Sequence, residues 1–291
     1  MIQFNNVKKT FRRTEVLKGL NLNITTGDRI ALVGSNGAGK TTMIRCLLGE
    51  YTFDGEVLVN GHNPRLERQI VLKDIGFVPQ LPPPLKMPVG QLIHFSASLC
   101  GSDPQEMIHV AERLGLDFEQ LKSRPFVKLS GGQKQKLLIS IALGRAAKIL
   151  ILDEPAANLD PDARHIFFQL LAEKKDEAVM LISSHRLDEV ASLVNRVIEM
   201  DQGLVILDDR VEDEVDLDSV LKTVITIKRV DEAFAKAIKL WKFKTDTADS
   251  DTAGLVWHGT VAGPDRLRFL GVLSRYAAIL KDIHMEERKN A

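Results

Sequence analysis

An eight-residue stretch that begins at residue 34 constrains the fold of this 291-residue chain more than any other feature. It matches the pattern G-x-x-x-x-G-K-[ST], whose glycines let backbone N–H groups approach an oxyanion closely. An apolar run over residues 29–33 precedes it and a helical pattern over residues 42–48 follows it, so we expect a strand, a loop and a helix. The N–H groups of such a loop, with the helix N-terminus behind them, bind anions. The residues of the loop and the next position are Gly34, Ser35, Asn36, Gly37, Ala38, Gly39, Lys40, Thr41 and Thr42.

Two side chains of this loop fit a nucleoside triphosphate and its metal ion. Lys40 would bring a mobile positive charge to the β- and γ-phosphates, and the hydroxyl of Thr41 suits Mg²⁺. The alternative is a glycine turn at a strand–helix junction that binds nothing. The predicted strand and helix on either side favour the phosphate-binding interpretation.

The composition excludes several classes of protein. Hydrophobic residues make up 44% and charged residues 27%, as in a soluble globular protein. Lys plus Arg and Asp plus Glu both number 39, so no overall basic field attracts nucleic acid or anionic lipid. The two cysteines, Cys46 and Cys100, fit no metal-ligand spacing and indicate no disulfide framework, so a reducing compartment is expected. The sequence shows no secretory signal and no apolar run of about 20 residues, so we expect any action at a membrane to require a partner.

Around the phosphate loop, the sequence predicts short strands and one helical insertion. Alternating or apolar runs over residues 2–33 indicate short strands, of which the last enters the loop. Residues 54–61 are predicted to form a strand and a turn, and residues 75–80 a strand that ends at Gln80. A run of three prolines then gives a stiff connector, and helical periodicity over residues 89–122 predicts a small inserted subdomain.

Residues 129–133 read Leu-Ser-Gly-Gly-Gln and precede a helical pattern from about Lys134 to Ala147. Ser130 could simply cap this helix. Two glycines at a helix entrance also form a second place where an anion can bind. One chain would then hold two such entrances, which suggests that a phosphate is held from two sides.

The apolar run over residues 149–152 is typical of a central parallel strand that is covered on both faces. It ends in Asp153 and Glu154, and carboxylates at the C-terminal end of such a strand lie where α/β sheets bind ligands. Asp153 is placed to hold Mg²⁺, directly or through water, and Glu154 could polarise an attacking water. Another apolar strand ends at His185, whose position alone leaves a structural and a catalytic role equally open.

The composition changes in residues 208–218, which contain seven acidic residues and one arginine and indicate a solvated linker or an exposed face. Strand and helix patterns then follow in the order β-α-β-(β)-α-β, which implies a small two-layer α+β domain. Because this part holds no catalytic constellation, a packing or regulatory role is favoured. The predicted boundaries are 1–210 for the main domain, about 89–128 for its helical subdomain, 211–218 for the linker and 219–291 for the C-terminal domain.

In their order and separations, these motifs resemble those of the ATP-binding subunits of ABC transporters. The phosphate loop alone would suit any P-loop ATPase, whereas Leu-Ser-Gly-Gly-Gln is the specific part. The resemblance covers residues 1–210 and implies an α/β fold, in which a P-loop NTPase core carries an N-terminal antiparallel β subdomain and an inserted α-helical subdomain. The C-terminal α+β domain is similar, in its order of elements, to the appendage of ABC-2-type exporter ATPases.

The resemblance implies a role for each motif residue within one subunit. Phe11 would stack on adenine, although its position 23 residues before Gly34 is by itself compatible with an ordinary core or surface role. Asp153 would be the aspartate of the metal site, Glu154 the general base, and His185 the switch histidine that touches the γ-phosphate. Gln80 would contact the metal ion and water, where the helical subdomain meets the membrane partner. ATP and Mg²⁺ are the implied ligands, bound by residues 34–42.

The resemblance also implies a head-to-tail dimer of ATPase domains. Ser130 and Gly132 would reach the γ-phosphate held by the opposite subunit, together with their neighbours Gly131 and Gln133. Asp160, in the sequence Asn-Leu-Asp at 158–160, would cross the dimer interface. ATP would close the dimer and hydrolysis would release it. The implied partner is a separate transmembrane permease, which places the chain in the cytoplasm on the inner face of the cell membrane.

Three functional hypotheses follow. The first is an ATP-hydrolysing subunit that powers a membrane exporter. The second is a soluble ABC-type ATPase acting on ribosomes or DNA, which the single ATPase unit and the absence of net basic charge disfavour. The third is a scaffold that binds ATP without turnover, which the presence of both Glu154 and His185 disfavours.

Overall fold

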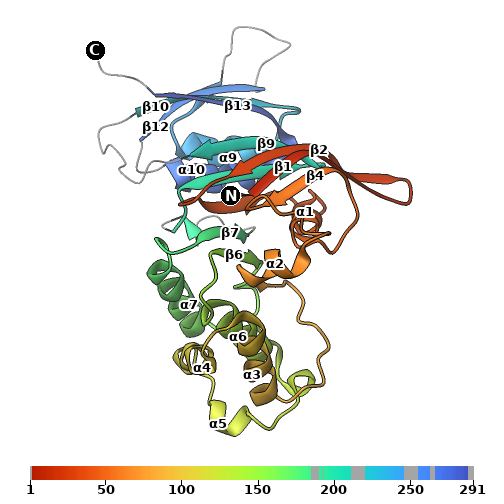
Figure 1. Ribbon diagram of the computed structural model, residues 1–291. Coiled ribbons are helices and arrows are strands. Elements are labelled where there is room, and N and C mark those ends of the chain that lie inside the picture. The colour runs from red at the N-terminus through yellow and green to blue at the C-terminus, as the bar shows by residue number, and fades with distance from the viewer. Residues whose placement is uncertain are drawn as a thin grey trace.

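The computed structural model describes residues 2–184, 190–191, 193–210, 220–245, 255–262 and 266–287. Three sheets and their helices make up these residues, in agreement with the predicted α/β class. In Figure 1, a group of helices lies at one end of the molecule, the C-terminal sheet lies at the other end, and the remaining strands lie between them.

The central sheet consists, in spatial order, of β5 (Ile75–Val78), β6 (Ile149–Asp153), β7 (Val179–Ser183), β3 (Arg29–Val33), β8 (Arg196–Asp201) and β9 (Leu204–Arg210). The first five strands are parallel and β9 is antiparallel to β8. All residues of β3, β6 and β7 are buried, because a parallel sheet is covered on both faces. Since parallel strands end at the same edge, the phosphate loop after β3 and the acidic pair at the end of β6 lie at one edge of the sheet.

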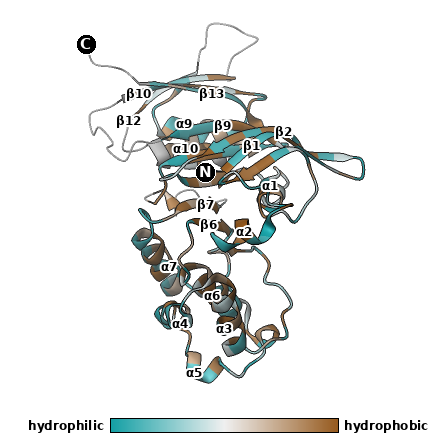
Figure 2. Cartoon of the chain, in the orientation of Figure 1, coloured by the Kyte–Doolittle hydropathy of each residue, from teal (hydrophilic) through white to brown (hydrophobic). Residues whose placement is uncertain are grey.

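A second, antiparallel sheet consists of β2 (Thr14–Ile24), β1 (Ile2–Phe11) and β4 (Asp54–Val59), in this order. The prediction of short strands before the loop was wrong in length, because β1 and β2 form a hairpin of 10 and 11 residues. Register shifts between Phe4 and Thr10, with Asn6 at a φ of 49°, interrupt the alternation from which strands are recognised. The far end of this hairpin is hydrophilic, as the teal colour in Figure 2 shows.

The predicted helical insertion after the proline run is present. It contains α3 (Val89–Cys100), α4 (Pro104–Arg113) and α5 (Phe118–Leu121). The other helices of the main domain are α1 (Lys40–Leu47), α2 (Arg68–Lys73), α6 (Gly131–Leu143) and α7 (Pro161–Glu173). Among the residues that the structure describes, no helix combines the length and the apolar composition that crossing a membrane requires.

The C-terminal domain has the predicted mixture of strands and helices. Its elements are β10 (Val220–Ile227), α9 (Glu232–Leu240), β11 (Lys244–Thr245), β12 (Val256–Ala262), α10 (Arg266–Ser274), a 3₁₀ turn (Ala277–Ile279) and β13 (Leu280–Glu287). The antiparallel order β11-β12-β10-β13 is that of a split β-α-β sandwich. Asp208 and Asp209, at the start of the acidic stretch, belong to β9, and residues 211–218, the predicted linker, lie outside the described residues.

The C-terminal domain and the central sheet share one hydrophobic core. Val33 of β3 and Val197 of β8 belong to the same buried cluster as Phe234 of α9 and Phe269 of α10. In Figure 1, α9 and α10 lie between the C-terminal sheet and the central strands. An ion pair between Lys228 and Asp201, at 3.7 Å, joins the two parts at the edge of this core. The C-terminal domain therefore covers one face of the sheet that carries the phosphate loop.

Glu199 is a buried carboxylic acid at this covered face. It lies in β8, in register with Val33 of β3 and Leu207 of β9. Its residue is 2% exposed, and its Oε1 has no hydrogen-bond partner among the described residues. Burial, with a smaller contribution from the negative charge of Asp201, raises the pKa of Glu199 to about 7.

We expect a Glu199→Gln substitution to stabilise the protein above pH 7. Because the pKa is raised in the folded state, ionisation favours unfolding, and the free energy of unfolding falls as the pH rises from about 4.5 to about 7. The loss is complete above pH 7 and amounts to about 3 kcal/mol for a shift of this size. The variant should therefore unfold at higher urea concentration than the wild type at pH 8, and differ much less at pH 5. A Glu15→Gln control at an exposed position should change neither midpoint, and equal shifts of the Glu199 variant at both pH values would contradict the assignment.

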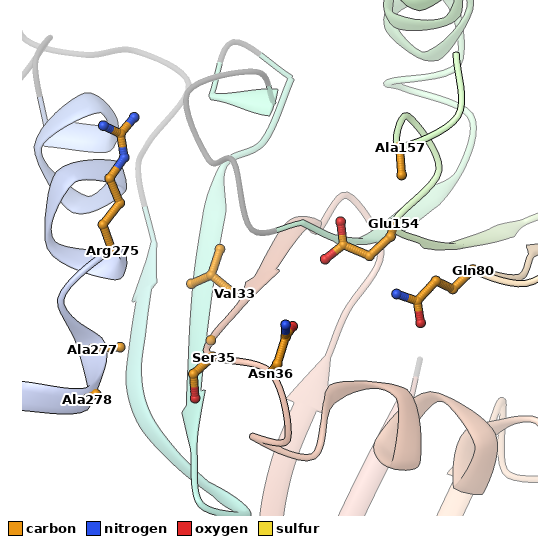
Figure 3. A pocket seen from close by; sticks show the side chains of 10 residues that line it. Val33, Ser35, Asn36, Gln80, Glu154, Ala157, Arg275, Ala277 and Ala278 are labelled. Atoms are coloured by element: carbon orange, nitrogen blue, oxygen red, sulfur yellow. The ribbon is translucent and has the colours of Figure 1, made fainter.

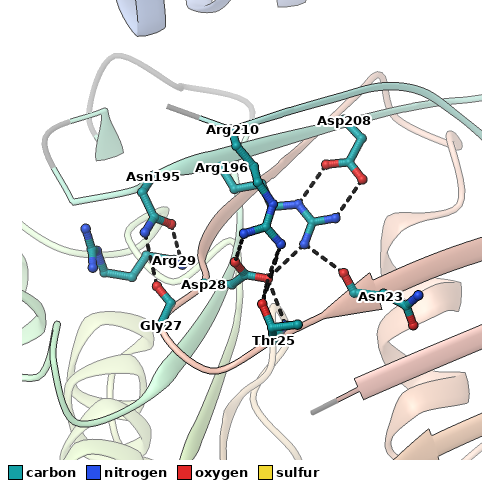
Figure 4. A network of polar contacts seen from close by, with 9 residues as sticks. All are labelled: Asn23, Thr25, Gly27, Asp28, Arg29, Asn195, Arg196, Asp208 and Arg210. Carbon is teal, nitrogen blue, oxygen red and sulfur yellow. Dashed lines mark hydrogen bonds and ion pairs between the residues drawn. The ribbon is translucent and has the colours of Figure 1, made fainter. Parts of the chain in front are cut away.

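An ion-pair network centred on the buried Arg196 and Asp28 joins the central strands at the edge of the sheet away from the phosphate loop (Figure 4). Arg196 at the start of β8 donates to both carboxylate oxygens of Asp208, at 2.7 and 2.6 Å, and to Oδ2 of Asp28 at 2.8 Å. Arg210 at the end of β9 pairs with Oδ1 of Asp28 at 2.9 Å. Asp28 directly precedes β3, so the network fixes the start of the strand that ends in the phosphate loop.

Candidate functional site

The phosphate loop joins β3 to α1 in backbone conformations that favour glycine. Gly34, Gly37 and Gly39 have φ values of 144°, 86° and 108°. A Cβ on Gly34 would lie 2.2 Å from the carbonyl oxygen of Met200, and a Cβ on Gly39 would lie 3.3 Å from that of Val16. The loop therefore packs closely against β2 and the end of β8, and a larger residue does not fit at position 34.

Lys40 begins α1, and its side chain turns back over the loop. Its Nζ donates to the carbonyl oxygens of Gly34 at 2.7 Å and Ser35 at 3.2 Å. The residue is 8% exposed. Burial lowers the pKa of Lys40, while the negative charges of Glu154 and Asp153 act in the opposite direction. The ammonium group thus lies against the backbone that the phosphates would approach.

Thr41 and Asp153 form the oxygen-rich part of the site. Thr41 Oγ1 donates to Asp153 Oδ2 at 3.0 Å, and Asp153, the last residue of β6, is 3% exposed. A hydroxyl and a carboxylate in contact are the oxygen ligands that Mg²⁺ prefers. These residues fit the metal ion that the sequence predicts, and the amide oxygen of Gln80 is a further ligand of the same chemical kind.

A cavity of about 420 Å³ opens beside the loop. The main domain lines it with residues of the loop, with Gln80 and with Glu154. Glu154 has a φ of 51°, which is uncommon for a residue with a side chain, and its N–H donates to the carbonyl oxygen of Ser183 at 3.1 Å. Figure 3 shows the carboxylate of Glu154 and the amide of Gln80 pointing into the space above Asn36. An unusual backbone conformation that directs a carboxylate into a cavity indicates a functional role.

Ser130 caps α6, as the sequence predicts. Its Oγ accepts from the N–H of Gln133 at 3.2 Å, and the Oε1 of Gln133 accepts from the N–H of Ser130 at 3.0 Å. The helix begins at Gly131, three residues before the predicted start, because this capping box organises the glycine-containing first turn. A Cβ on Gly131 would meet nothing within 4 Å, so the backbone of this turn is open to a ligand.

This helix entrance lines a second cavity, of about 340 Å³. Ser130, Gly132 and Gln133 form one wall, and Asp117, Lys136 and Asp160 are among the other lining residues. The two cavities have no lining residue in common. The two predicted phosphate-binding entrances are therefore separate in one copy of the chain.

Asp160 and Lys136 form a contact that sequence reasoning missed. Asp160 caps α7 by accepting from the N–H of Ala163 at 2.9 Å, and it pairs with Lys136 Nζ at 2.8 Å. The hydrogen bond from Lys136 holds the pKa of Asp160 below its usual value. Lys136 lies three residues after Gln133 on α6, so its position within one helical turn of the motif was the available signal. The predicted role of Asp160 across a dimer interface stays a prediction.

Phe11 and His185 are the remaining predicted residues. Phe11 is 38% exposed as a residue. Its ring packs edge-on against that of Tyr51, with 5.1 Å between the ring centroids, and the ammonium of Lys9 lies 4.8 Å from the Phe11 centroid. It lies at the end of β1, and the next strand passes the phosphate loop at Val16. Stacking on adenine stays a prediction. His185 lies outside the described residues, two positions after the end of β7.

Comparisons with known proteins agree with this geometry. The chain matches the ABC transporter family over residues 17–157. It is 31% identical over 218 residues to the glutamine transport ATP-binding protein GlnQ of Escherichia coli (strain K12), covering 70% of this chain and 89% of GlnQ. The human cholesterol transporter ABCA5 is 34% identical over 214 residues, which cover 70% of this chain but only 13% of that relative. The dimeric structure of MJ0796, a bacterial ABC transporter cassette, shares the fold with a TM-score of 0.64 at 24% identity, covering 73% of this chain and 99% of the cassette.

The fold and the site define a P-loop domain of the ATPase class, with ATP as its nucleotide. The chain belongs to the ABC transporter family, and it carries the ATP-binding domain of that family. The resemblance drawn from the Leu-Ser-Gly-Gly-Gln segment is thus confirmed.

Proposed function

We propose that this chain is the ATP-hydrolysing subunit of a membrane transporter, of the ABC-2 exporter type, and that ATP closes two such domains head to tail. The observation that carries the proposal is the separation of the phosphate loop and the α6 entrance into two cavities without a shared residue. A nucleotide held by both entrances needs the second one from another copy. The cassette MJ0796, which shares this fold, is described as dimeric, and this supports the arrangement.

Each ATP site of the proposed dimer, built from the phosphate loop of one copy and the α6 entrance of the other, would bind ATP and activate the attacking water. The N–H groups of the phosphate loop and the ammonium of Lys40 would bind the triphosphate, and Phe11 would orient the adenine. Thr41, Asp153 and Gln80 would hold Mg²⁺, which neutralises phosphate charge when it is bound. Glu154 would accept the proton of the attacking water, while Ser130 and the glycines of the second copy would orient the γ-phosphate together with His185.

Exposed apolar side chains near Gln80 in the sequence support docking to a membrane partner. Five large apolar residues between positions 66 and 99 are 51% to 83% exposed, and such side chains on a water-soluble surface mark interaction sites when they gather. GlnQ, which this chain covers almost fully, is named as a transport ATP-binding protein. A separate transmembrane permease is therefore the proposed partner, to which this chain would bind on the inner face of the cell membrane. The five residues are Leu66, Ile70, Leu81, Phe95 and Leu99.

Affinity purification of the tagged chain from detergent-solubilised host membranes tests this proposal. We expect a polytopic membrane protein at near-equal stoichiometry in mass spectrometry. A Phe95→Asp variant should lose this protein, whereas Leu240→Asp, at an even more exposed apolar position of the C-terminal domain, should retain it. Ribosomal proteins or DNA-repair factors without any membrane protein would overturn the transporter proposal in favour of a soluble ATPase.

A further inference from the structure

The C-terminal domain supplies part of the wall of the phosphate-loop cavity. Arg275, Ala277 and Ala278, from the end of α10 and the 3₁₀ turn before β13, line the same cavity as Ser35 and Glu154. Figure 3 shows the two alanines on the side of the cavity that Ser35 occupies. The guanidinium of Arg275 points away from Glu154 in this view, so the chemistry of hydrolysis does not explain why this segment lies here.

This wall is held firmly in place. Ala277 is buried, and Ile279 belongs to the core shared with the central sheet. The hydroxyl of Tyr276 donates to the carbonyl oxygen of Ala233 at 3.2 Å, and the N–H of Lys228 donates to that of Ile279 at 2.7 Å. Ala278, in contrast, is exposed, so its methyl group is available to a molecule that enters from solvent.

The shape of the wall suits a close approach of protein backbone. Ala277 and Ala278 carry the smallest side chains other than glycine, and they stand beside the loop that holds the triphosphate. In the proposed dimer, the α6 entrance of the second copy must reach this same cavity. That entrance is also built of small residues, namely Ser130, Gly131 and Gly132, and Gly131 is open to contact.

We propose that residues 275–278 of one copy contact the Leu-Ser-Gly-Gly-Gln segment of the second copy when ATP closes the dimer. The C-terminal domain is then part of the composite ATP site and a condition for its closure. This inference rests on the proposed function, because it requires the head-to-tail dimer.

A bulky side chain at position 278 tests the contact. In a Glu154→Gln background, we expect Ala278→Trp to weaken ATP-dependent dimerisation about tenfold or more in sedimentation equilibrium, because overpacking a close contact is unfavourable. Dimerisation is compared at an ATP concentration that calorimetry shows to saturate the single copy of each variant, which keeps an effect of the indole on nucleotide binding apart from an effect on the contact. Thr260→Trp, at an exposed position of β12 in the sheet of the same domain that α9 and α10 separate from the central strands, should dimerise like the parent.

Cross-linking provides an independent measurement. Cys46 is buried, and burial raises its pKa to about 11, so a Cys100→Ser background leaves little reactive thiol. With Ala278→Cys and Gly131→Cys together, a short bis-maleimide should link two copies in the presence of ATP, and Thr260→Cys with Gly131→Cys should not be linked.

The outcomes separate this inference from the function on which it rests. If the Glu154→Gln parent dimerises with ATP but Ala278→Trp does so equally well and no cross-link forms, the contact is refuted and the proposed function stands. If the parent itself stays monomeric with ATP bound, both the dimer and the contact are refuted.

Discussion

A Glu154→Gln variant is expected to lose ATP turnover by about a hundredfold to ten-thousandfold while it still binds ATP. The amide keeps the size of the carboxylate but cannot accept the proton of the attacking water. The φ of 51° at this residue is set by the turn after β6, which the substitution leaves in place. Phosphate release at saturating ATP measures the turnover, and size-exclusion chromatography measures the ATP-bound dimer that should accumulate.

A Glu177→Gln substitution is the matched control. Glu177 is an exposed carboxylate that forms an ion pair with Lys174 at 2.7 Å and lines neither of the two cavities of the site. Its removal should leave both turnover and assembly unchanged. Hydrolysis by the Glu154 variant at the wild-type rate would exclude Glu154 as the general base.

Lys40→Ala is expected to weaken ATP binding about tenfold to a hundredfold, the loss that follows from removing a charged hydrogen-bond donor. The ammonium is already held within the loop by the carbonyl oxygens of Gly34 and Ser35, so little ordering is needed when the phosphates arrive. Burial lowers the pKa of Lys40, while the neighbouring carboxylates Glu154 and Asp153 favour its charged form. Isothermal titration calorimetry measures the change in affinity.

Lys18→Ala, at an exposed position on β2, serves as the control for general loss of charge. It should bind ATP like the wild type. A thermal melt of both variants checks that the Lys40 variant remains folded, since its two hydrogen bonds to the loop are also lost. Unchanged affinity in a folded Lys40→Ala protein would remove this residue from the site.

The fold was predictable from sequence where burial leaves a regular pattern, either a continuous apolar run in a strand covered on both faces or a helical period in a helix with one buried face. The apolar runs that became β3, β6 and β7 and the helices α3 and α4 follow such patterns. The hairpin was underestimated because its register shifts interrupt the period of two. The start of α6 was placed too late because glycine has low helix propensity, and the capping box that overrides it acts through side-chain geometry.

The same distinction holds for the candidate site, where residues in a sequence motif were predictable and residues defined by packing alone were not. Thr41 and Asp153 are 112 positions apart, yet each lies in a motif that identified it. In the structure, Thr41 Oγ1 and Asp153 Oδ2 are 3.0 Å apart. Glu199 and Ala278 carry no motif. Both residues stand out only because the C-terminal domain packs against the central sheet and its phosphate loop. Such contacts are set by tertiary packing, which no local sequence pattern reveals.

The core that β3 and β8 share with the C-terminal domain has a consequence for how such chains can be recombined. In sequence, the acidic stretch before β10 resembles a connector at which a module could be cut and exchanged. A cut there would divide the buried cluster that holds Val33 and Val197 on one piece and Phe234 and Phe269 on the other, so each piece would expose apolar surface that the other now covers. Successful grafting of this C-terminal domain onto another cassette therefore requires the central strands of the recipient to carry a matching apolar surface. The C-terminal domain and the central strands have to be exchanged together.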